Sequence, residues 1–409
     1  NFEKNRVYDL GRTTGGTGNI IGMYFNTPTG NIVANNLVYN LSSYNQDISG
    51  ILFEDSYGNN QFIYNTVSLA GSYLSPAAVT TSSAMRLDWA NPNDVIANNI
   101  FANTITGSPD ASSYSIYLVG NPPNSLFNNN NYWVSGVNGK LAYNWGNDLL
   151  NIYDIRNGFG QNDLSINADP LFLSANDFHL TNASMAVFEG TPLQSISDDI
   201  MFVQRPAERP SMGAFEYTGV DVIPAPRLIS PANMLNPFTI GDALTWTDVA
   251  QAAQFVIQVS TNAQFANATS YPINNPDVTF LQTDFNMLSP NTEYFWRAMA
   301  IQLDGTTSHW SESRSFISNG QLPAPTPIYP DNASSVATST FIWGSVLGAT
   351  VYELQYASNP NFSPSMIIST VDTLYEANDL VDNNNYFWRV RAGRNVDGEI
   401  EYGLWFTPE

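Results

Sequence analysis

The amino-acid sequence predicts an all-β protein in which a solenoid of stacked coils precedes two β-sandwich modules. Three observations support this prediction. A short apolar pattern that contains asparagine recurs at intervals of about 30 residues in the first third of the chain. Two segments near the C-terminus resemble each other, and long runs of the strong helix formers Ala, Leu, Glu and Lys are missing. We therefore expect almost no helix.

The composition excludes several classes of protein. The 409 residues contain no cysteine, so disulfides and thiolate metal sites are excluded. Lys and Arg number 14 against 36 Asp and Glu, and the net charge of -22 argues against binding to nucleic acid or anionic membranes. No stretch approaches about 20 uncharged apolar residues, so we expect no membrane span.

The same features suit a large secreted protein that is stabilised by core burial. The chain begins with Asn1 and carries no signal peptide. We therefore expect an extracellular or cell-surface protein, and we interpret the chain as an internal piece of a longer precursor.

Five segments of the first third align in one register. They are KNRVYDL, NNLVYNL, YNTVSLA, NNIFANT and NNNYWVS, which begin at residues 4, 35, 64, 98 and 129. The asparagines that share a position in them are Asn5, Asn36, Asn65, Asn99 and Asn130. Short apolar strands that alternate with Gly, Asn and Pro turns at this period indicate a solenoid, with coils stacked about 4.8 Å apart.

These asparagines have a structural explanation. Asparagine tolerates the left-handed backbone of a tight bend, so each one can divide a coil into two strands. Its side-chain amide can hydrogen-bond to the same residue of the next coil, which produces an asparagine ladder. We favour this role over ligand binding. Because Asn5 already occupies the ladder position, we expect further coils upstream.

The NN-I-F-x-N repeats resemble those of the right-handed parallel β-helix proteins of the pectate-lyase-like superfamily. The resemblance covers about residues 1–137. It implies the architecture of a first domain at residues 1–139 and says little about function.

Residues 140–221 are expected to end the β-helix. Four stretches resemble the closing segment of bacterial surface β-helix proteins of the choice-of-anchor-Q type: Asp169–Phe172, Asp177–Leu180, Arg209-Pro210 and Gly213–Tyr217. Met185 and Phe188-Glu189 depart from that pattern. The resemblance implies a cap over the open end of the solenoid, where strand edges would otherwise be exposed. We expect His179 to hydrogen-bond backbone within this cap rather than to bind a metal.

Two modules follow, at residues 222–321 and 322–409, each introduced by a proline-rich linker. Trp246 of the first corresponds to Trp343 of the second, and both are expected in the cores of seven-strand sandwiches. LSPNTEY, which ends at Tyr294, and LVDNNNY, which ends at Tyr386, resemble the tyrosine corner of fibronectin type III domains. The resemblance implies spacer or binding modules.

One face of the solenoid carries candidate functional residues. In the segments GMYFN, GILFE, AMRLD and SIYLV, alternation predicts two outward rows. The rows are Tyr24, Leu52, Arg86 and Tyr117, and Asn26, Glu54, Asp88 and Val119. Glu54 and Asp88 then lie on adjacent coils, at about the 5 Å separation of the two carboxylates in retaining glycosidases.

Three hypotheses remain open for this face. The first is structural, with Arg86 neutralising Glu54 and Asp88 on a solvated surface. The second is polysaccharide binding, because aromatic, carboxylate and amide side chains on a flat strand face suit sugar rings and hydroxyls. Its candidate residues are Tyr24, Glu54, Arg86, Asp88, Trp89 and Tyr117. The third is catalysis by Glu54 and Asp88, which ranks last because structural ion pairs are far commoner than catalytic dyads. The N-T-D, G-H-G and R-I-K motifs of pectinases are also absent.

We therefore expect a non-catalytic surface or adhesin-type structural protein that has polysaccharide or other cell-surface proteins as partners. A carbohydrate-active enzyme, either a polysaccharide lyase or a glycoside hydrolase, is the alternative. No cofactor or metal is predicted, although bound calcium stays open. The whole assembly resembles secreted surface proteins of Bacteroidota, many of which use type IX export.

Overall fold

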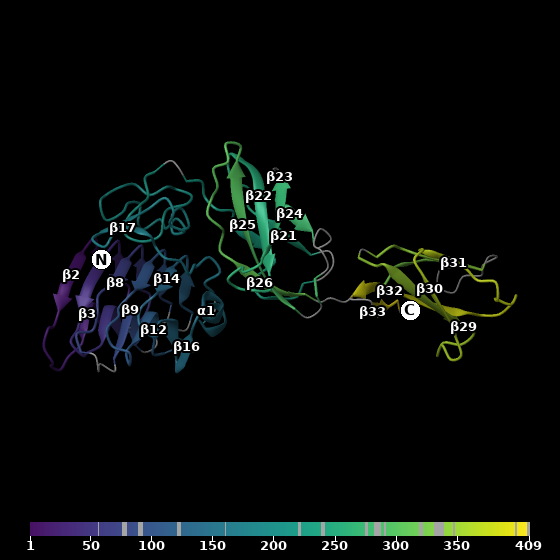
Figure 1. The fold of residues 1–409 in the computed structure, drawn as a ribbon, viewed down its shortest axis with the longest axis horizontal. Coiled ribbons are helices and arrows are strands. Elements are labelled where there is room, and N and C mark those ends of the chain that lie inside the picture. Colours follow the sequence, from purple (N-terminus) through teal and green to yellow (C-terminus); the bar gives the residue numbers. More distant parts are fainter. Residues whose placement is uncertain are drawn as a thin grey trace.

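The computed structural model of the chain describes residues 1–55, 57–75, 80–88, 93–120, 124–159, 161–219, 222–238, 242–274, 277–281, 288–289, 292–318, 322–330, 339–346, 348–396 and 399–406. The predicted fold class is confirmed, because a parallel β-solenoid is followed by two immunoglobulin-like or fibronectin III-like β-sandwiches (Figure 1). The helix α1 (Ile152–Phe159) is the one helix of the described residues, and it is too short to span a membrane.

Three parallel sheets form the walls of the solenoid. Sheet A contains β1 (Phe2–Glu3), β4 (Ile32–Ala34), β7 (Gln61–Ile63), β10 (Val95–Ala97) and β13 (Leu126–Asn128). Sheet B contains β2 (Arg6–Gly11), β5 (Leu37–Ser42), β8 (Thr66–Leu69), β11 (Ile100–Asn103) and β14 (Asn131–Val134). Sheet C contains β3 (Ile20–Asn26), β6 (Ile48–Glu54), β9 (Thr81–Asp88), β12 (Ser112–Leu118) and β15 (Lys140–Asn144), and the antiparallel β16 (Asn147–Leu149) extends it.

Apolar residues of successive coils stack on one another along the inside of these walls. In sheet A, Val33 pairs with Phe62, Phe62 with Ile96 and Ile96 with Phe127, and all four side chains are buried. The rows of sheets B and C join them in one apolar core. Burial of these side chains from every coil is the main force that holds the solenoid together.

An asparagine ladder runs between sheets A and B. The backbone N–H and the side-chain Nδ2 of Asn36 both donate to Oδ1 of Asn65, at 3.1 and 2.9 Å. The same pair of hydrogen bonds joins Asn5 to Asn36, Asn65 to Asn99, and Asn99 to Asn130, across sequence separations of 31, 34 and 31 residues. The Nδ2 groups of the last four also donate to backbone carbonyls of the preceding coil. These amides therefore join each coil to the next.

The predicted left-handed conformation was assigned to the wrong residue. Positive φ occurs one position earlier, at Lys4, Asn35, Tyr64, Asn98 and Asn129, with values of 53 to 59°. The earlier residue turns the chain, and the later residue builds the ladder. A second ladder, which the sequence did not reveal, joins Asn31 to Asn60 and Asn60 to Asp94 at the other side of sheet A.

The part of the expected cap that carries the choice-of-anchor-Q resemblance lies along the flank of the solenoid rather than across its end. Helix α1 covers the end, where Ile152, Ile155 and Phe159 join the solenoid core. Residues 167–217, which include β17 (Phe172–Ser174) and β18 (Asp177–Leu180), pack on the outside (Figure 1). We call residues 167–217 the flank segment. An exposed side wall of stacked bends needs cover as much as the open end does.

The two sandwiches repeat one plan. The first has a three-stranded sheet of β19 (Leu228–Ser230), β21 (Ala243–Trp246) and β24 (Thr279–Leu281), and a five-stranded sheet of β20 (Leu235–Phe238), β26 (Arg314–Ser318), β25 (Glu293–Gln302), β22 (Ala252–Ser260) and β23 (Thr269–Asn274). The second has β27 (Pro327–Tyr329), β28 (Thr340–Trp343) and β31 (Leu374–Glu376) facing β30 (Met366–Thr370), β29 (Val351–Ala357), β32 (Phe387–Val396) and β33 (Glu399–Trp405).

Both sandwich predictions that named tryptophan or tyrosine agree with the structure. Trp246 and Trp343 are buried in the two cores. The hydroxyl of Tyr294 accepts a hydrogen bond from the backbone N–H of Ser289 at 2.9 Å, and Tyr386 does the same for Val381 at 3.0 Å. These bonds reach five residues upstream and have the geometry of a tyrosine corner.

The first sandwich is docked on the solenoid. Tyr153 of α1 packs against Phe295 with ring centroids 4.7 Å apart, and its hydroxyl lies 2.6 Å from Oγ of Ser313. Arg156 of α1 donates to the carbonyl of Ser313, and Arg227 donates to the carbonyl of Gly190 at 2.7 Å. The contacts involve both α1 and the flank segment, so they fix the sandwich at two places.

Candidate functional site

The outer face of sheet C carries the two rows expected from the sequence. Tyr24 pairs with Leu52, Leu52 with Arg86, and Arg86 with Tyr117, and Tyr143 continues the row on β15. In the second row Asn26 pairs with Glu54, and Glu54 with Asp88. The two carboxylates are therefore on adjacent strands. Trp89 lies outside the described residues.

Arg86 pairs with Asp88 and not with Glu54. Its Nε lies 2.7 Å from Oδ1 of Asp88 on the same strand, and its Nη1 lies 4.0 Å from Oδ2 of Asp47. The structural hypothesis placed Arg86 between Glu54 and Asp88, so its ion pairs differ from those expected. About a quarter of the Arg86 side chain, 24%, is exposed, and Asp88 is 15% exposed. Because Arg86 and Asp88 both belong to β9, the strand itself holds this half-buried ion pair in place.

Glu54 is bound by the neighbouring strand β3. The hydroxyl of Tyr24 donates to Oε2 of Glu54, and Nδ2 of Asn26 lies 2.8 Å from the Tyr24 hydroxyl and 3.3 Å from the same carboxylate oxygen. The hydrogen bond to Glu54 raises the pKa of Tyr24 above its ordinary value. The Tyr24 side chain is 50% exposed, which leaves aromatic surface open beside a fixed carboxylate.

Tyr117 is enclosed by its neighbours in the row. Arg86 lies over its ring at 4.9 Å from one adjacent strand, and Tyr143 stacks on it at 4.2 Å from the other. Burial and the neighbouring Tyr143 raise the pKa of Tyr117 to about 12. The ring faces of Tyr117 are therefore occupied, and it is suited to position Arg86 rather than to stack on a sugar itself.

Trp145 is a candidate that the sequence analysis missed. It occupies the two-residue turn between β15 and β16, two residues beyond Tyr143, and is 66% exposed. Its φ is 42° and that of Gly146 is 91°. Two-residue hairpins of this kind favour Asn-Gly, and a bulky residue with positive φ is a strained exception. The available signal was a tryptophan in the turn sequence NWGN, since strained exposed residues often mark functional positions.

A charged group lies at the same end of the face. Lys140 Nζ lies 3.0 Å from Oδ2 of Asp148, and the hydroxyl of Tyr114 donates to Oδ1 of Asp148 at 2.9 Å. The Lys140 and Asp148 side chains are 25% and 38% exposed. The outer face of sheet C therefore presents carboxylates, amides, cations and aromatic surface from β3 to β16.

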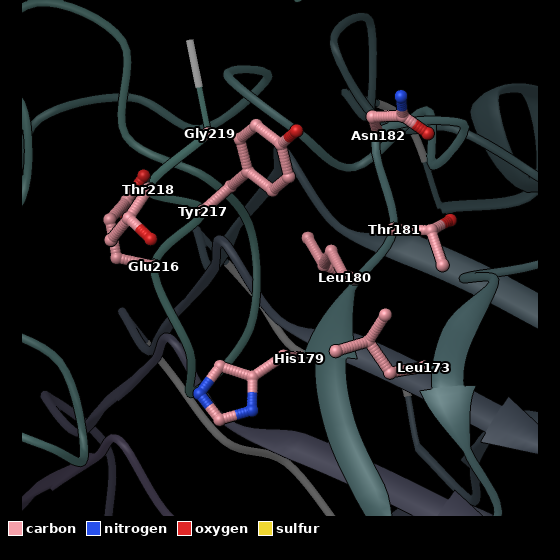
Figure 2. Close-up of a pocket in the computed structure, with 9 residues that line it drawn as sticks. All are labelled: Leu173, His179, Leu180, Thr181, Asn182, Glu216, Tyr217, Thr218 and Gly219. Atoms are coloured by element: carbon pink, nitrogen blue, oxygen red, sulfur yellow. The ribbon is translucent and has the colours of Figure 1, made fainter. Parts of the chain in front are cut away.

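A separate hollow of about 580 Å³ lies on the flank segment (Figure 2). His179 and Leu173 lie toward one side of it and Tyr217 toward the other. The prediction for His179 was wrong: its ring Nδ1 lies 2.6 Å from Oδ1 of Asp177, not from a backbone group. Hydrogen bonds from His179 lower the pKa of Asp177. The carboxylate of Glu216, another lining residue, is bound to Arg205 and Ser211.

No three His, Cys, Asp or Glu side chains in the part of the chain that the structure describes gather closely enough to hold a metal ion. Acid–base chemistry at Glu54 and Asp88 would require both groups to turn toward one substrate. In the structure each has another partner.

The match to a protein-family model lies in the C-terminal half of the chain. Residues 244–318 match the model of the Rha78A-like, N-terminal immunoglobulin domain. A crystal structure of the FN1–FN3 domains of chicken CNTN1 has 14% identity and a TM-score of 0.20, and the match covers 45% of this chain and 64% of that one. A two fibronectin type III domain segment from chicken tenascin has 14% identity and a TM-score of 0.22, with 44% and 97% covered. No curated protein matches the chain.

The match to the CNTN1 structure covers 64% of that chain, which is less than two thirds of its length. The strand order and the tyrosine corners define the class, which is an all-β protein with a β-solenoid followed by immunoglobulin-like or fibronectin III-like domains. That architecture is consistent with a surface or structural protein.

Proposed function

We propose that the chain is part of a non-catalytic extracellular surface protein of the adhesin type, in which the outer face of sheet C binds polysaccharide. The sandwiches act as spacers that hold the solenoid away from its point of attachment. The resemblance of the closing segment to anchor-type β-helix proteins supports a surface location, and export by a type IX pathway in Bacteroidota is part of the same proposal.

The observation that carries the binding proposal is the continuity of the outer face of sheet C. Five parallel strands at about 4.8 Å spacing give it a length of about 19 Å between the first and last of them. Tyr24 is open at one end, and Trp145 follows the opposite end. An extended polymer can cross such a row and meet a new strand at each step.

The polar groups of the face are suited to sugar hydroxyls. Asp88 is fixed by Arg86, and Glu54 is fixed by Tyr24 and Asn26. A fixed carboxylate with lone pairs to spare accepts hydroxyl hydrogen bonds without losing side-chain entropy on binding. Exposed aromatic rings supply apolar surface for the carbon-bound faces of a sugar.

The same pairing favours binding over catalysis. A retaining glycosidase needs one carboxyl group as an acid and the other as a free nucleophile on either side of the scissile bond. Here Asp88 is neutralised by Arg86, and Glu54 is bonded toward β3. A carbohydrate-active enzyme that uses Glu54 and Asp88 remains the alternative function.

Affinity electrophoresis in gels that contain single polysaccharides, acidic and neutral, tests the proposal. We expect retardation of the chain by at least one polysaccharide and a clear loss of retardation in Tyr24→Ala and Trp145→Ala. Phe202→Ala is the matched control, because Phe202 is an exposed aromatic residue on the flank segment, 72% exposed. Equal retardation of all three variants would place binding elsewhere.

A further inference from the structure

The two sandwiches differ at one edge strand. In the first, β23 pairs with β22 in a register that sets Ser270 opposite Gln258 and Pro272 opposite Val256. In the second, β30 pairs with β29 and sets Ile367 opposite Gln355 and Ser369 opposite Glu353. Gln258 pairs with Arg297 and Gln355 pairs with Arg389, and each arginine ends a Y-F-W-R sequence. Gln258 and Gln355 therefore occupy corresponding positions in the two sandwiches. The corresponding pairs are Ser270 with Ile367, Pro272 with Ser369, and Asn274 with Val371.

These replacements remove the protection of the edge. Proline in an edge strand has no N–H to offer an incoming strand, and polar side chains make the edge a poor surface for another chain. The first sandwich has Pro272 between Ser270 and Asn274. The second has Ser369 between Ile367 and Val371 at the same places. Strand β30 can therefore donate and accept backbone hydrogen bonds along its whole length.

The side of the second sandwich near β30 is apolar. Met366 is 48% exposed, Ile367 58% and Val371 74%. Leu374 of β31, at the edge of the opposite sheet, is 44% exposed. An open strand edge with exposed apolar side chains is a site for the addition of another strand.

The charge of the chain identifies the occupant. Residues 363–371, SPSMIISTV, carry no charge, whereas the whole chain has a net charge of -22. A net charge of -22 opposes the association of two copies, but antiparallel contact of β30 with itself brings no like charges into register. A self-complementary strand also suits an interface with two-fold symmetry, in which the same patch serves both partners.

We infer that β30 pairs antiparallel with β30 of a second copy of this chain. The four-stranded sheet of each second sandwich then continues into that of its partner. The solenoids lie at the far ends of the paired chains, so a dimer presents two outer faces of sheet C. The first sandwich takes no part, because Pro272 blocks its corresponding edge.

Sedimentation velocity of the full chain over a wide concentration range tests this inference. We expect a reversible shift from the monomer mass of 45.0 kDa to twice that mass, with little dependence on salt. Ser369→Pro and Ile367→Lys should each abolish the shift. Ser270→Lys, at the corresponding position of the first sandwich, is the matched control and should leave it unchanged.

Two results would overturn the inference. One is a chain that stays monomeric at every concentration, and the other is a dimer that both β30 variants still form. Thermal melting of each variant shows whether it folds, and Ile367→Lys keeps the test decisive if Ser369→Pro does not. Amide hydrogen exchange adds a local readout, since the amides of residues 366–370 should gain protection with concentration while those of β23 do not.

Discussion

Asn35 and Asn36 are neighbours in the chain, but they bind on opposite sides of the solenoid wall. Asn36 donates inward to Asn65 of the next coil, and Nδ2 of Asn35 donates outward to the carbonyl of Asp198 in the flank segment at 2.8 Å. The positive φ of Asn35 turns the chain so that consecutive side chains leave in different directions. The asparagine pair therefore serves coil stacking and flank docking at the same time.

The ladder makes a measurable contribution to stability. Asn36→Ala and Asn99→Ala should each lower the free energy of unfolding by about 1–2 kcal/mol, because buried hydrogen-bonding groups lose their partners. Chemical denaturation measures the change. Asn19→Ala is the control, since Asn19 is exposed in the loop before β3 and outside the ladder. Unchanged midpoints in both ladder variants would contradict this assignment.

The outward asparagines should control the flank segment locally. Asn98 donates to the carbonyl of Thr191 at 2.8 Å and accepts from its N–H at 2.9 Å. We expect Asn98→Gly, which removes the side chain but tolerates the positive φ of this bend, to increase the rate of proteolytic cleavage within residues 167–217 while the solenoid strands keep their exchange protection. A variant that loses protection uniformly would show that Asn98 supports the coils instead.

A buried ion pair fastens the flank segment. Arg205 lies 3.0 Å from Glu216, with side chains only 2% and 1% exposed, and it also donates to Asn35 at 2.8 Å. Arg205→Ala should reduce stability by about 3–5 kcal/mol, because it leaves a buried carboxylate unpaired. The double variant Arg205→Met/Glu216→Leu should recover much of that loss. If the double variant is as unstable as Arg205→Ala, the loss arises from packing and not from the charge.

Stability should depend on pH through Glu312 at the docked sandwich. Burial, together with the nearby Glu189, raises its pKa from 4.5 to about 7. Between these values the unfolded chain ionises and the folded chain stays protonated, so stability falls as pH rises from 4.5 to 7, by about 3 kcal/mol. Above pH 7 this contribution is constant.

Glu312→Gln isolates that contribution. Glu312 accepts a hydrogen bond from the backbone N–H of Leu228 at 3.2 Å, and the side-chain amide oxygen of glutamine can accept the same bond. We expect the variant to lose this part of the pH dependence in urea unfolding curves and to be more stable than the parent above pH 7. Glu208→Gln, at an exposed position, is the control. Parallel pH profiles of Glu312→Gln and the parent would contradict the prediction.

Repetition explains which features the sequence could predict. Asn36, Asn65 and Asn99 recur in one register, and so do the apolar and polar positions around Glu54 and Asp88, so the coils and rows could be placed. Tyr294 and Tyr386 were placed by a local motif with its own geometry. The path of residues 167–217 has no such repeat and depends on long-range contacts such as Lys4 with Asp198, at 2.8 Å.

The details of the outer face of sheet C depended on side-chain choices that a register does not specify. Arg86 had three acidic groups within reach of its strand and pairs with Asp88 and Asp47. Tyr117 lies on the expected row, but a register alone does not predict that Arg86 and Tyr143 cover its ring. Trp145 was overlooked because it falls in a turn after the periodic segments end.

The central proposal is that the outer face of sheet C binds polysaccharide without cleaving it. The most direct test incubates the chain with a polysaccharide that retains it and measures both bound protein and new reducing ends, with Glu54→Gln/Asp88→Asn in parallel. We predict retention with no new ends, and weaker retention in the double variant. New reducing ends that disappear in the double variant would contradict the proposal and make the chain an enzyme.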